Sequence, residues 1–425
     1  MNRFIPKLSC RSWLCIAVFN FLLVALMGLL MRLKFLYSIP WIDQKNIMHA
    51  HSHFAFTAWV SMALMVFMPM LILSLKVKEK LPLRYQILLL LNLVCSLCMM
   101  VAFSLQGYAF FSILFSTLSL FIGYFFCYYC WKDLNLIELP ANLKLWYKVA
   151  LLASILSSLG TYFLVYLKVT QQADPLKQLA SIYFYLHFQY NGWFIFGCMA
   201  VFNHWLFQQF KVNLFSSKFH YAYAATLLPA YFLSVLWWKG MPTWLYVLLV
   251  MTVLLQLGLW LFYAKTNLTH IKRQTASVFR KPANWMFLVI LIALTLKLLL
   301  QAVSVVPALS ELVYGFRPIV IAYLHLVLLV IISMFILAFA FQQGALSVNR
   351  MASWSMLVIC IGVFLNESLL AVQGIGGLIR VYIDGTHQGL LLAAIIMSLG
   401  ILLLLISQLP ILKSREIRGS IPAPI

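Results

Sequence analysis

The stretch IMHAHSHFAFTAWVSMALMVFMP, residues 47–69, decides the fold of this chain. It begins with three histidines, His49, His51 and His53, and continues as an apolar run that extends to residue 75. A helix needs about 20 mostly apolar residues to cross the hydrocarbon core of a bilayer. We therefore predict a membrane-spanning helix over residues 47–75, with three imidazoles at its beginning.

Apolar runs of similar length recur along the whole chain. Its 425 residues are 64% hydrophobic and 9% charged, whereas a soluble domain carries about 25% charged residues. No polar stretch is long enough for a second, soluble domain, so residues 1–425 are expected to form one transmembrane helical domain. We predict an all-α, polytopic membrane protein with twelve spans, at residues 12–32, 47–75, 84–105, 108–131, 146–167, 180–209, 220–238, 243–263, 285–306, 318–343, 351–373 and 385–408.

The basic residues give these spans a direction. With a cytoplasmic N-terminus, 21 of the 30 Lys and Arg residues fall in inner loops and termini, eight fall in outer loops, and Lys297 lies inside a span. Cytoplasmic loops carry such an excess of Lys and Arg. Both termini are therefore expected on the cytoplasmic side of a bacterial inner membrane. The net charge of +21 is spread over these short loops, which argues against a groove for nucleic acid.

The eight cysteines lie almost entirely within the apolar runs. Two pairs have CxxC spacing, Cys95 with Cys98 and Cys127 with Cys130. Each pair shares one helix face, but the first lies deep in its span and the second lies next to a loop. We interpret all four as packing residues rather than as a joint metal or redox site.

Six of the nine histidines share one depth in the predicted membrane. They begin four even-numbered spans: His49, His51 and His53 the second, His187 the sixth, His325 the tenth and His387 the twelfth. These spans run from the outside inwards, so at about 1.5 Å per residue all six imidazoles lie in the outer half of the bilayer. Ionisable side chains in a membrane are costly and indicate function by default. Neutral imidazole is a usual ligand of haem iron, copper and zinc.

Helical spacing separates the first three histidines. His49 and His53 are four residues apart and share one face, whereas His51 points about 160° away from them. Haem with two histidine ligands needs one imidazole from each of two helices, and a second metal needs two or three more. Arg317 and Arg380 lie at the outer ends of two histidine-bearing spans. An arginine fork at that level matches the carboxylate of a haem propionate.

Together, the span count, the inner termini, the string HAHSHFAF (residues 49–56) and the outer histidines of the second, sixth and tenth spans resemble the catalytic subunit of the haem-copper oxidases and nitric oxide reductases. The resemblance implies that His49 or His53, together with His325, binds a low-spin haem, taken as haem b. It also implies that His187 binds a second metal ion, copper or iron. His51 and His387 complete the candidate metal ligands.

The sequence departs from that family at three places. The seventh span has no outer histidine pair, the tenth has one histidine instead of two, and His387 has no family counterpart. A haem- and copper-containing family associated with nitric oxide stress, the NnrS-like proteins, has a similar layout. The expected function is a haem-binding membrane protein that handles electrons or a diatomic gas, with the lipid bilayer and further membrane or electron-transfer subunits as partners.

Other functions fit the same residues. A transporter for a metal or small solute would use the histidines as an outward-facing site and would contain broken helices. A non-catalytic assembly subunit would need no cofactor. A membrane di-iron oxygenase is disfavoured, because HxxxH spacing occurs only at His49 and His53 and lies on the outer side.

Two further charges lie inside predicted spans, Lys297 in the ninth and Glu367 in the eleventh. If they are neighbours, they neutralise each other. Alternatively, Glu367 takes part in proton delivery.

Overall fold

The computed structural model of the chain describes residues 7–172, 174–211, 213, 215–274, 280, 282–306, 309 and 316–419. Within these ranges the regular secondary structure is helical, and extended pairing is limited to one bridge between Ser9 and Lys80. The all-α prediction is confirmed for this part of the chain.

The described helices form twelve rods. Eight rods are single helices: α1 (Cys10–Leu36), α4 (Leu83–Gln106), α5 (Phe110–Leu136), α6 (Ala141–Val169), α11 (Thr243–Gln274), α12 (Ala283–Val303), α16 (Arg350–Leu378) and α17 (Thr386–Gly419). The other four consist of consecutive helices: α2 (Gln44–Phe54), η1 (Ala55–Ser61) and α3 (Met62–Ile72); α7 (Pro175–His187), η2 (Phe188–Phe194) and α8 (Ile195–Phe210); α9 (Ser217–Ala225), α10 (Leu227–Ala230) and η3 (Tyr231–Val235); and α14 (Arg317–His325), η4 (Leu326–Ser333) and α15 (Met334–Gln342).

In the described part of the chain, ten of these rods are long and apolar enough to cross a membrane. They include the predicted second span, observed over Gln44–Ile72, and the predicted third span, observed over Leu83–Gln106. The two remaining rods lie at the predicted sixth and seventh spans. The first is rich in polar and aromatic side chains between Ser181 and Asn191, and the second is divided into short helices around Pro229. The ten apolar rods indicate a multi-pass protein in a lipid bilayer.

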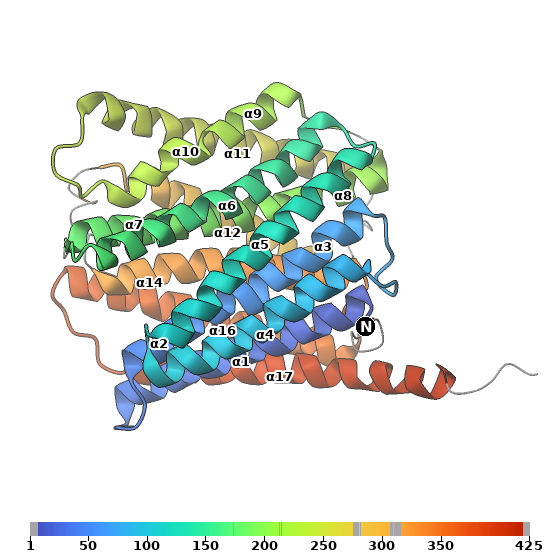
Figure 1. Cartoon of the computed structure of the whole chain (residues 1–425), viewed down its shortest axis with the longest axis horizontal. Coiled ribbons are helices and arrows are strands. Elements are labelled where there is room, and N and C mark those ends of the chain that lie inside the picture. The colour runs from blue at the N-terminus through green and yellow to red at the C-terminus, as the bar shows by residue number, and fades with distance from the viewer. Residues whose placement is uncertain are drawn as a thin grey trace, which may run out of the picture.

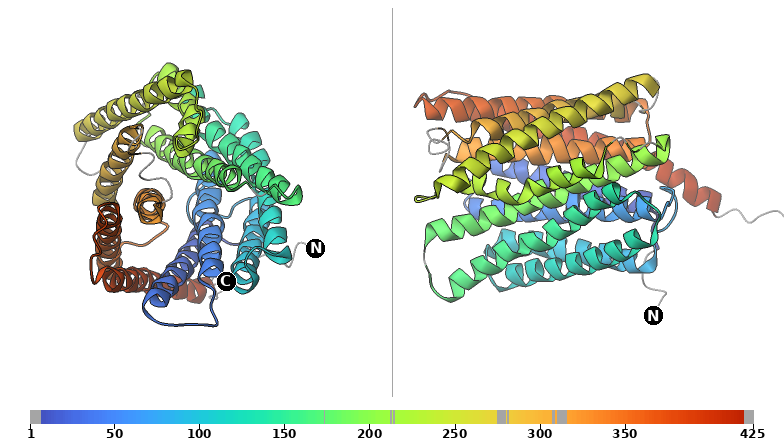
Figure 2. Two further views of the ribbon diagram at one scale, coloured as in Figure 1. Left: turned by 90° about the vertical axis from the view of Figure 1, so that its left-hand side faces the viewer. Right: turned by 90° about the horizontal axis from the view of Figure 1, so that it is seen from above.

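Successive rods run in opposite directions, so the first and the last described helix have their free ends at the same end of the bundle (Figure 1). We call this the terminal end. The opposite end, where α1 ends and where α2, α14 and α17 begin, is called the histidine end. Figure 2 shows the rods arranged around α14, which stands inside the ring formed by the others.

The turn between α4 and α5 depends on Gly107, in a stretch without any charged residue. Its φ of 61° lies in the left-handed region, and a Cβ at this position would lie 2.4 Å from Oδ1 of Asn46. Only glycine combines that backbone conformation with so close an approach. The break predicted between residues 105 and 108 is therefore present, between Gln106 and Phe110.

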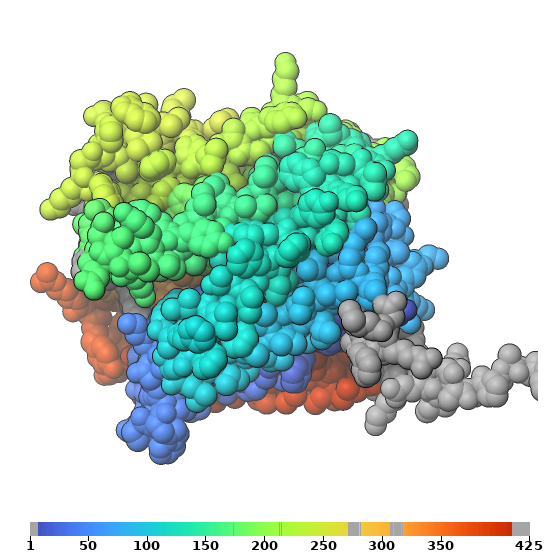
Figure 3. All heavy atoms as spheres, in the orientation of Figure 1, coloured from blue at the N-terminus to red at the C-terminus, as the bar shows by residue number. Residues whose placement is uncertain are grey.

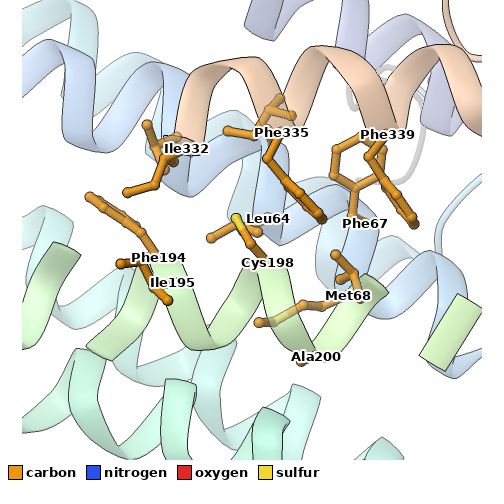
Figure 4. Packing of buried hydrophobic residues seen from close by; sticks show 14 of the residues in the cluster. Leu64, Phe67, Met68, Phe194, Ile195, Cys198, Ala200, Ile332, Phe335 and Phe339 are labelled. Carbon is orange, nitrogen blue, oxygen red and sulfur yellow. The ribbon is translucent and has the colours of Figure 1, made fainter. Parts of the chain in front are cut away.

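The core of the bundle lies between α3, α8 and α15 (Figure 4). Phe67 of α3 meets Phe339 of α15 edge to face, with ring centroids 5.0 Å apart. In the most apolar stretch of the Gln44–Ile72 rod, 83% of the residues are buried. In that of α5, 22% are buried. Phe121 and Phe125 of α5 are exposed. The α5 segment lies on the face toward the viewer in Figure 3. Large exposed apolar side chains along a rod are typical of a lipid-facing helix.

Candidate functional site

His51 and His325 lie on facing rods at the histidine end, close enough for their rings to interact electrostatically. Nδ1 of His51 is 3.0 Å from the carbonyl oxygen of Val24 in α1. Nδ1 of His325 is 2.9 Å from the carbonyl oxygen of Ile321, one turn earlier in α14. A carbonyl can only accept, so each Nδ1 carries a proton, and in the neutral ring Nε2 then keeps its lone pair. Both rings therefore present Nε2 as a potential ligand atom.

Arg32 and Glu367 complete this group. Arg32 of α1 interacts electrostatically with both histidines and with Glu367 of α16. Oε1 of Glu367 accepts a hydrogen bond of 3.0 Å from Nδ2 of Asn366. The group thus contains two imidazoles, one cation and one acid, from α1, α2, α14 and α16.

The expected pairing of Glu367 with Lys297 is wrong. Lys297 is 2% exposed, and its Nζ donates to Oε1 of Gln301 at 2.7 Å. Gln301 in turn donates to Gln256 of α11 at 3.0 Å. The two charges lie on different rods and are buried against different neighbours. Their positions along the predicted spans do not reveal these neighbours. Lys297 instead lies within electrostatic range of His187.

His49 and His53 face away from His325, contrary to the expectation that one of them pairs with it. Nε2 of His53 is 3.1 Å from the hydroxyl of Tyr108, and its ring stacks on Phe103 with centroids 4.4 Å apart. The ring of His49 meets Tyr108 edge to face at 4.6 Å. The opposite faces of the three histidines were predicted from spacing. The rotation of α2 then turns the His49 and His53 face toward α4 and its turn, and His51 toward α1 and α14.

His187 is buried by protein on both sides of its ring. Its Nε2 lies 2.9 Å from the carbonyl oxygen of Leu227, and its Nδ1 lies 3.1 Å from the side-chain amide of Asn191. Both ring nitrogens therefore have a protein partner. In this arrangement His187 links the sixth rod to the break in the seventh rod and has no nitrogen left for a metal ion.

The last three predicted residues lie near the rim of the histidine end. His387 stacks on Phe35 with centroids 5.2 Å apart, and its Nδ1 is buried without a hydrogen-bond partner. Arg380 is exposed and lines a cavity of about 330 Å³ together with Phe316 and Gln373. Arg317 begins α14, but its side chain lies outside the described part of the structure.

The predicted metal ligands His51, His187 and His387 do not converge on one point. Each has different ring neighbours, from α1, from α10 and from the end of α1 respectively. Within the residues that the structure describes, no group of three or more His, Cys, Asp or Glu side chains is placed to hold a metal ion.

The α14 helix is less completely buried at the histidine end than the continuation of its rod. Although α14 stands inside the ring of rods (Figure 2), every residue from 318 to 326 is only half-buried. Farther along the same rod, residues 334–341 are all buried. Close-packed protein interiors bury their side chains fully. The contrast indicates looser packing around α14, whose Pro318 lines the same cavity as Arg380.

Three π-helical segments follow the histidine turns, and no pattern in the sequence predicted them. η1 follows His53, η2 follows His187 and η4 follows His325. Segments of this kind are rare and frequently occur at functional sites. Two indole hydrogen bonds join the three, from Trp59 to Ser333 at 2.8 Å and from Trp193 to Ser61 at 3.1 Å. The histidine-bearing turns are therefore fixed relative to one another.

Comparison with known proteins adds no family to this geometry, since neither the protein-family models nor the curated proteins include a significant match to the chain.

Proposed function

We propose that this chain is a multi-pass membrane protein that binds one haem between His51 and His325 and passes electrons through it. The observation that carries the proposal is that the two imidazole rings have the same hydrogen bonding. Each fixes Nδ1 on a backbone carbonyl, at 3.0 Å and 2.9 Å, and leaves Nε2 available. Metal-binding histidines commonly anchor their second nitrogen in this way.

The surroundings of the two rings fit a haem. They belong to separate rods, so each would offer its Nε2 to the iron from a different helix. The half-buried residues 318–326 indicate looser packing around His325 than farther along its rod. Arg380 at the adjoining cavity, and Arg32 beside both rings, supply cations for two propionates.

Such a haem would supply one-electron redox chemistry. The residues of this chain determine whether the haem would transfer electrons or bind a gas. His51 and His325 would both hold the iron through Nε2, which would favour electron transfer over binding of a gas. The separation of His187 and His387 from this pair supports a single haem, without the second metal that the resemblance implies. Neither CxxC pair is followed by histidine, as covalent attachment requires, so a haem would be held without a covalent bond, as haem b is.

We infer twelve spans with both termini in the cytoplasm of a bacterium. The two rods that lack sufficient hydropathy still run the length of the bundle between apolar neighbours (Figure 1). The terminal end carries most of the Lys and Arg residues, so the positive-inside rule assigns it to the cytoplasm. The His51–His325 pair then lies near the outer surface, where a further electron-transfer subunit would have access.

The test is haem content and a reduced-minus-oxidised absorption spectrum of the full chain, purified after haem supply. We expect a sharp haem α-band that is lost in His51→Ala and His325→Ala. The matched control is His53→Ala, two residues away on the opposite face, which should retain the band. His51→Met keeps an axial ligand and should raise the reduction potential. A wild-type protein without haem, or loss of haem in the control alone, contradicts the proposal.

One observation favours a transporter as the second candidate. The seventh rod is broken at α9, α10 and η3, and the carbonyl of Leu227 at this break contacts His187, near the buried Lys297. Broken helices beside buried polar groups are typical of transporter binding sites. Solute uptake by reconstituted vesicles that is abolished in Lys297→Met and retained in His51→Ala would favour this function over haem binding.

A further inference from the structure

A second group of cations lies at the terminal end, far from the histidines along each rod. The loop between α15 and α16, residues 343–349, forms an open hollow of about 530 Å³ lined by Arg280, Gly344, Leu346, Ser347 and Val348. Arg280 precedes α12, and Arg11 of α1 reaches the same loop from behind. The hollow is therefore built from three parts of the sequence.

Arg11 is a buried cation that forms no ion pair with an acid among the described residues. It is 6% exposed, and one of its terminal nitrogens donates to Oγ of Ser347 at 2.7 Å. Its Nε is buried and has no hydrogen-bond partner in the part of the chain that the structure describes. In the described residues the ion pairs are Arg84 with Asp133 and Lys177 with Asp174, so Arg11 and Arg280 have no carboxylate partner there. A buried guanidinium with an unused donor is costly unless an anion approaches it.

Two features place Arg280 over the loop, a hydrogen bond from its backbone and the lack of a side chain at Gly344. Its backbone N–H donates to Oε1 of Gln342 at 2.9 Å. A Cβ on Gly344 would lie 2.7 Å from one guanidinium nitrogen of Arg280, and Gly344 has a φ of 72°. The side-chain nitrogen of Gln343 is a further buried donor without a partner. The loop thus presents several donors and no acid.

The loop itself is fixed before any ligand arrives. Gln408 of α17 accepts from the backbone N–H of Ser347 at 2.8 Å and donates to its carbonyl at 3.3 Å. Asn349 donates to the carbonyl of Ser407 at 3.0 Å. Such preorganisation lowers the entropy that a ligand must lose on binding.

We propose that this hollow binds a phosphate group, and that its source is the headgroup of an anionic phospholipid in the facing leaflet. Guanidinium forks match phosphate oxygens in geometry and charge. Basic pockets between transmembrane helices on the cytoplasmic side are suited to anionic headgroups. The Ser347 hydroxyl accepts from the buried Arg11 and donates its own proton to the phosphate. Arg280 contacts the phosphate directly. The proposal does not depend on haem binding.

The experiment is a thermal-unfolding titration of the delipidated full chain in neutral detergent. Phosphatidylglycerol, phosphatidylcholine and inorganic phosphate are added separately. We expect phosphatidylglycerol to raise the melting temperature, with an apparent affinity about tenfold weaker in Arg280→Gln. Arg350→Gln removes an exposed arginine next to the loop that does not line the hollow, and should change the affinity by less than about twofold.

Ser347→Ala provides a second variant that leaves both arginines in place and should also weaken the lipid effect. Equal stabilisation by inorganic phosphate, lost in Arg280→Gln, would support the site and assign it to soluble phosphate. Equal stabilisation by phosphatidylcholine, an equal loss in both arginine variants, or no stabilisation by any of the three would overturn the proposal.

Discussion

Gly160 allows α6 and α7 to cross in contact, and replacing it tests the packing that positions His187. A Cβ at residue 160 would lie 2.6 Å from the carbonyl oxygen of Ser181 and 2.8 Å from the backbone nitrogen of Tyr185. Ordinary contact begins at 3.4 Å, so Gly160→Ala requires a separation of about 0.8 Å between the two helices. Both obstacles are backbone atoms, so no side-chain rotation relieves the clash.

The expected cost follows from overpacking, which destabilises a core by about 1–3 kcal/mol. Alanine also favours a helix over glycine by about 1 kcal/mol. Gly123→Ala and Gly258→Ala measure that gain alone, because a Cβ at either position meets nothing within 4 Å. We therefore expect Gly160→Ala to be less stable than both controls by about 1–3 kcal/mol.

The assay is equilibrium unfolding in mixed detergent micelles, followed by tryptophan fluorescence. Equal stability of Gly160→Ala and the two controls would refute the close approach of α6 and α7. A loss in all three variants would instead show that alanine is unfavourable in these helices generally, and would remove the basis of the comparison.

Two further substitutions test the surroundings of the histidines. Trp59→Phe removes the hydrogen bond to Ser333 and should lower the free energy of unfolding by about 1 kcal/mol, whereas Trp244→Phe, at an exposed position, should leave it unchanged. An equal effect of both would contradict the role of the indole bond. Tyr108→Phe removes the hydroxyl that contacts His53 and should leave haem content and reduction potential unchanged; a loss of haem would contradict the assignment of the haem to the opposite face.

The positions of the helices could be predicted closely because membrane solvation acts on local composition. The predicted third span, 84–105, is observed as Leu83–Gln106 and the predicted second, 47–75, as Gln44–Ile72. The seventh span, 220–238, was predicted as one helix and is instead three short ones that end at Val235. The α9 helix ends at Ala225 and α10 begins at Leu227, whose carbonyl oxygen is bonded to His187 of the sixth rod.

The site was predicted in part. Depth along each span follows from the rise per residue, so histidines from separate rods were expected at one level. Rotation about each rod does not follow from depth. The π-helical segments also escaped prediction, because they depend on interhelical bonds such as that of Trp59 to Ser333, which joins residues 274 positions apart.

The sequence by itself determined the all-helical fold, the positions of the apolar rods and the opposite faces of His51 and His53, because hydropathy and helical period act over one or a few turns. Only the tertiary structure decided that His51, rather than His53, faces His325, and that Lys297 and Glu367 lie apart. Those outcomes depend on how each rod is rotated against its neighbours. That rotation is fixed by packing and hydrogen bonds between residues far apart in the chain.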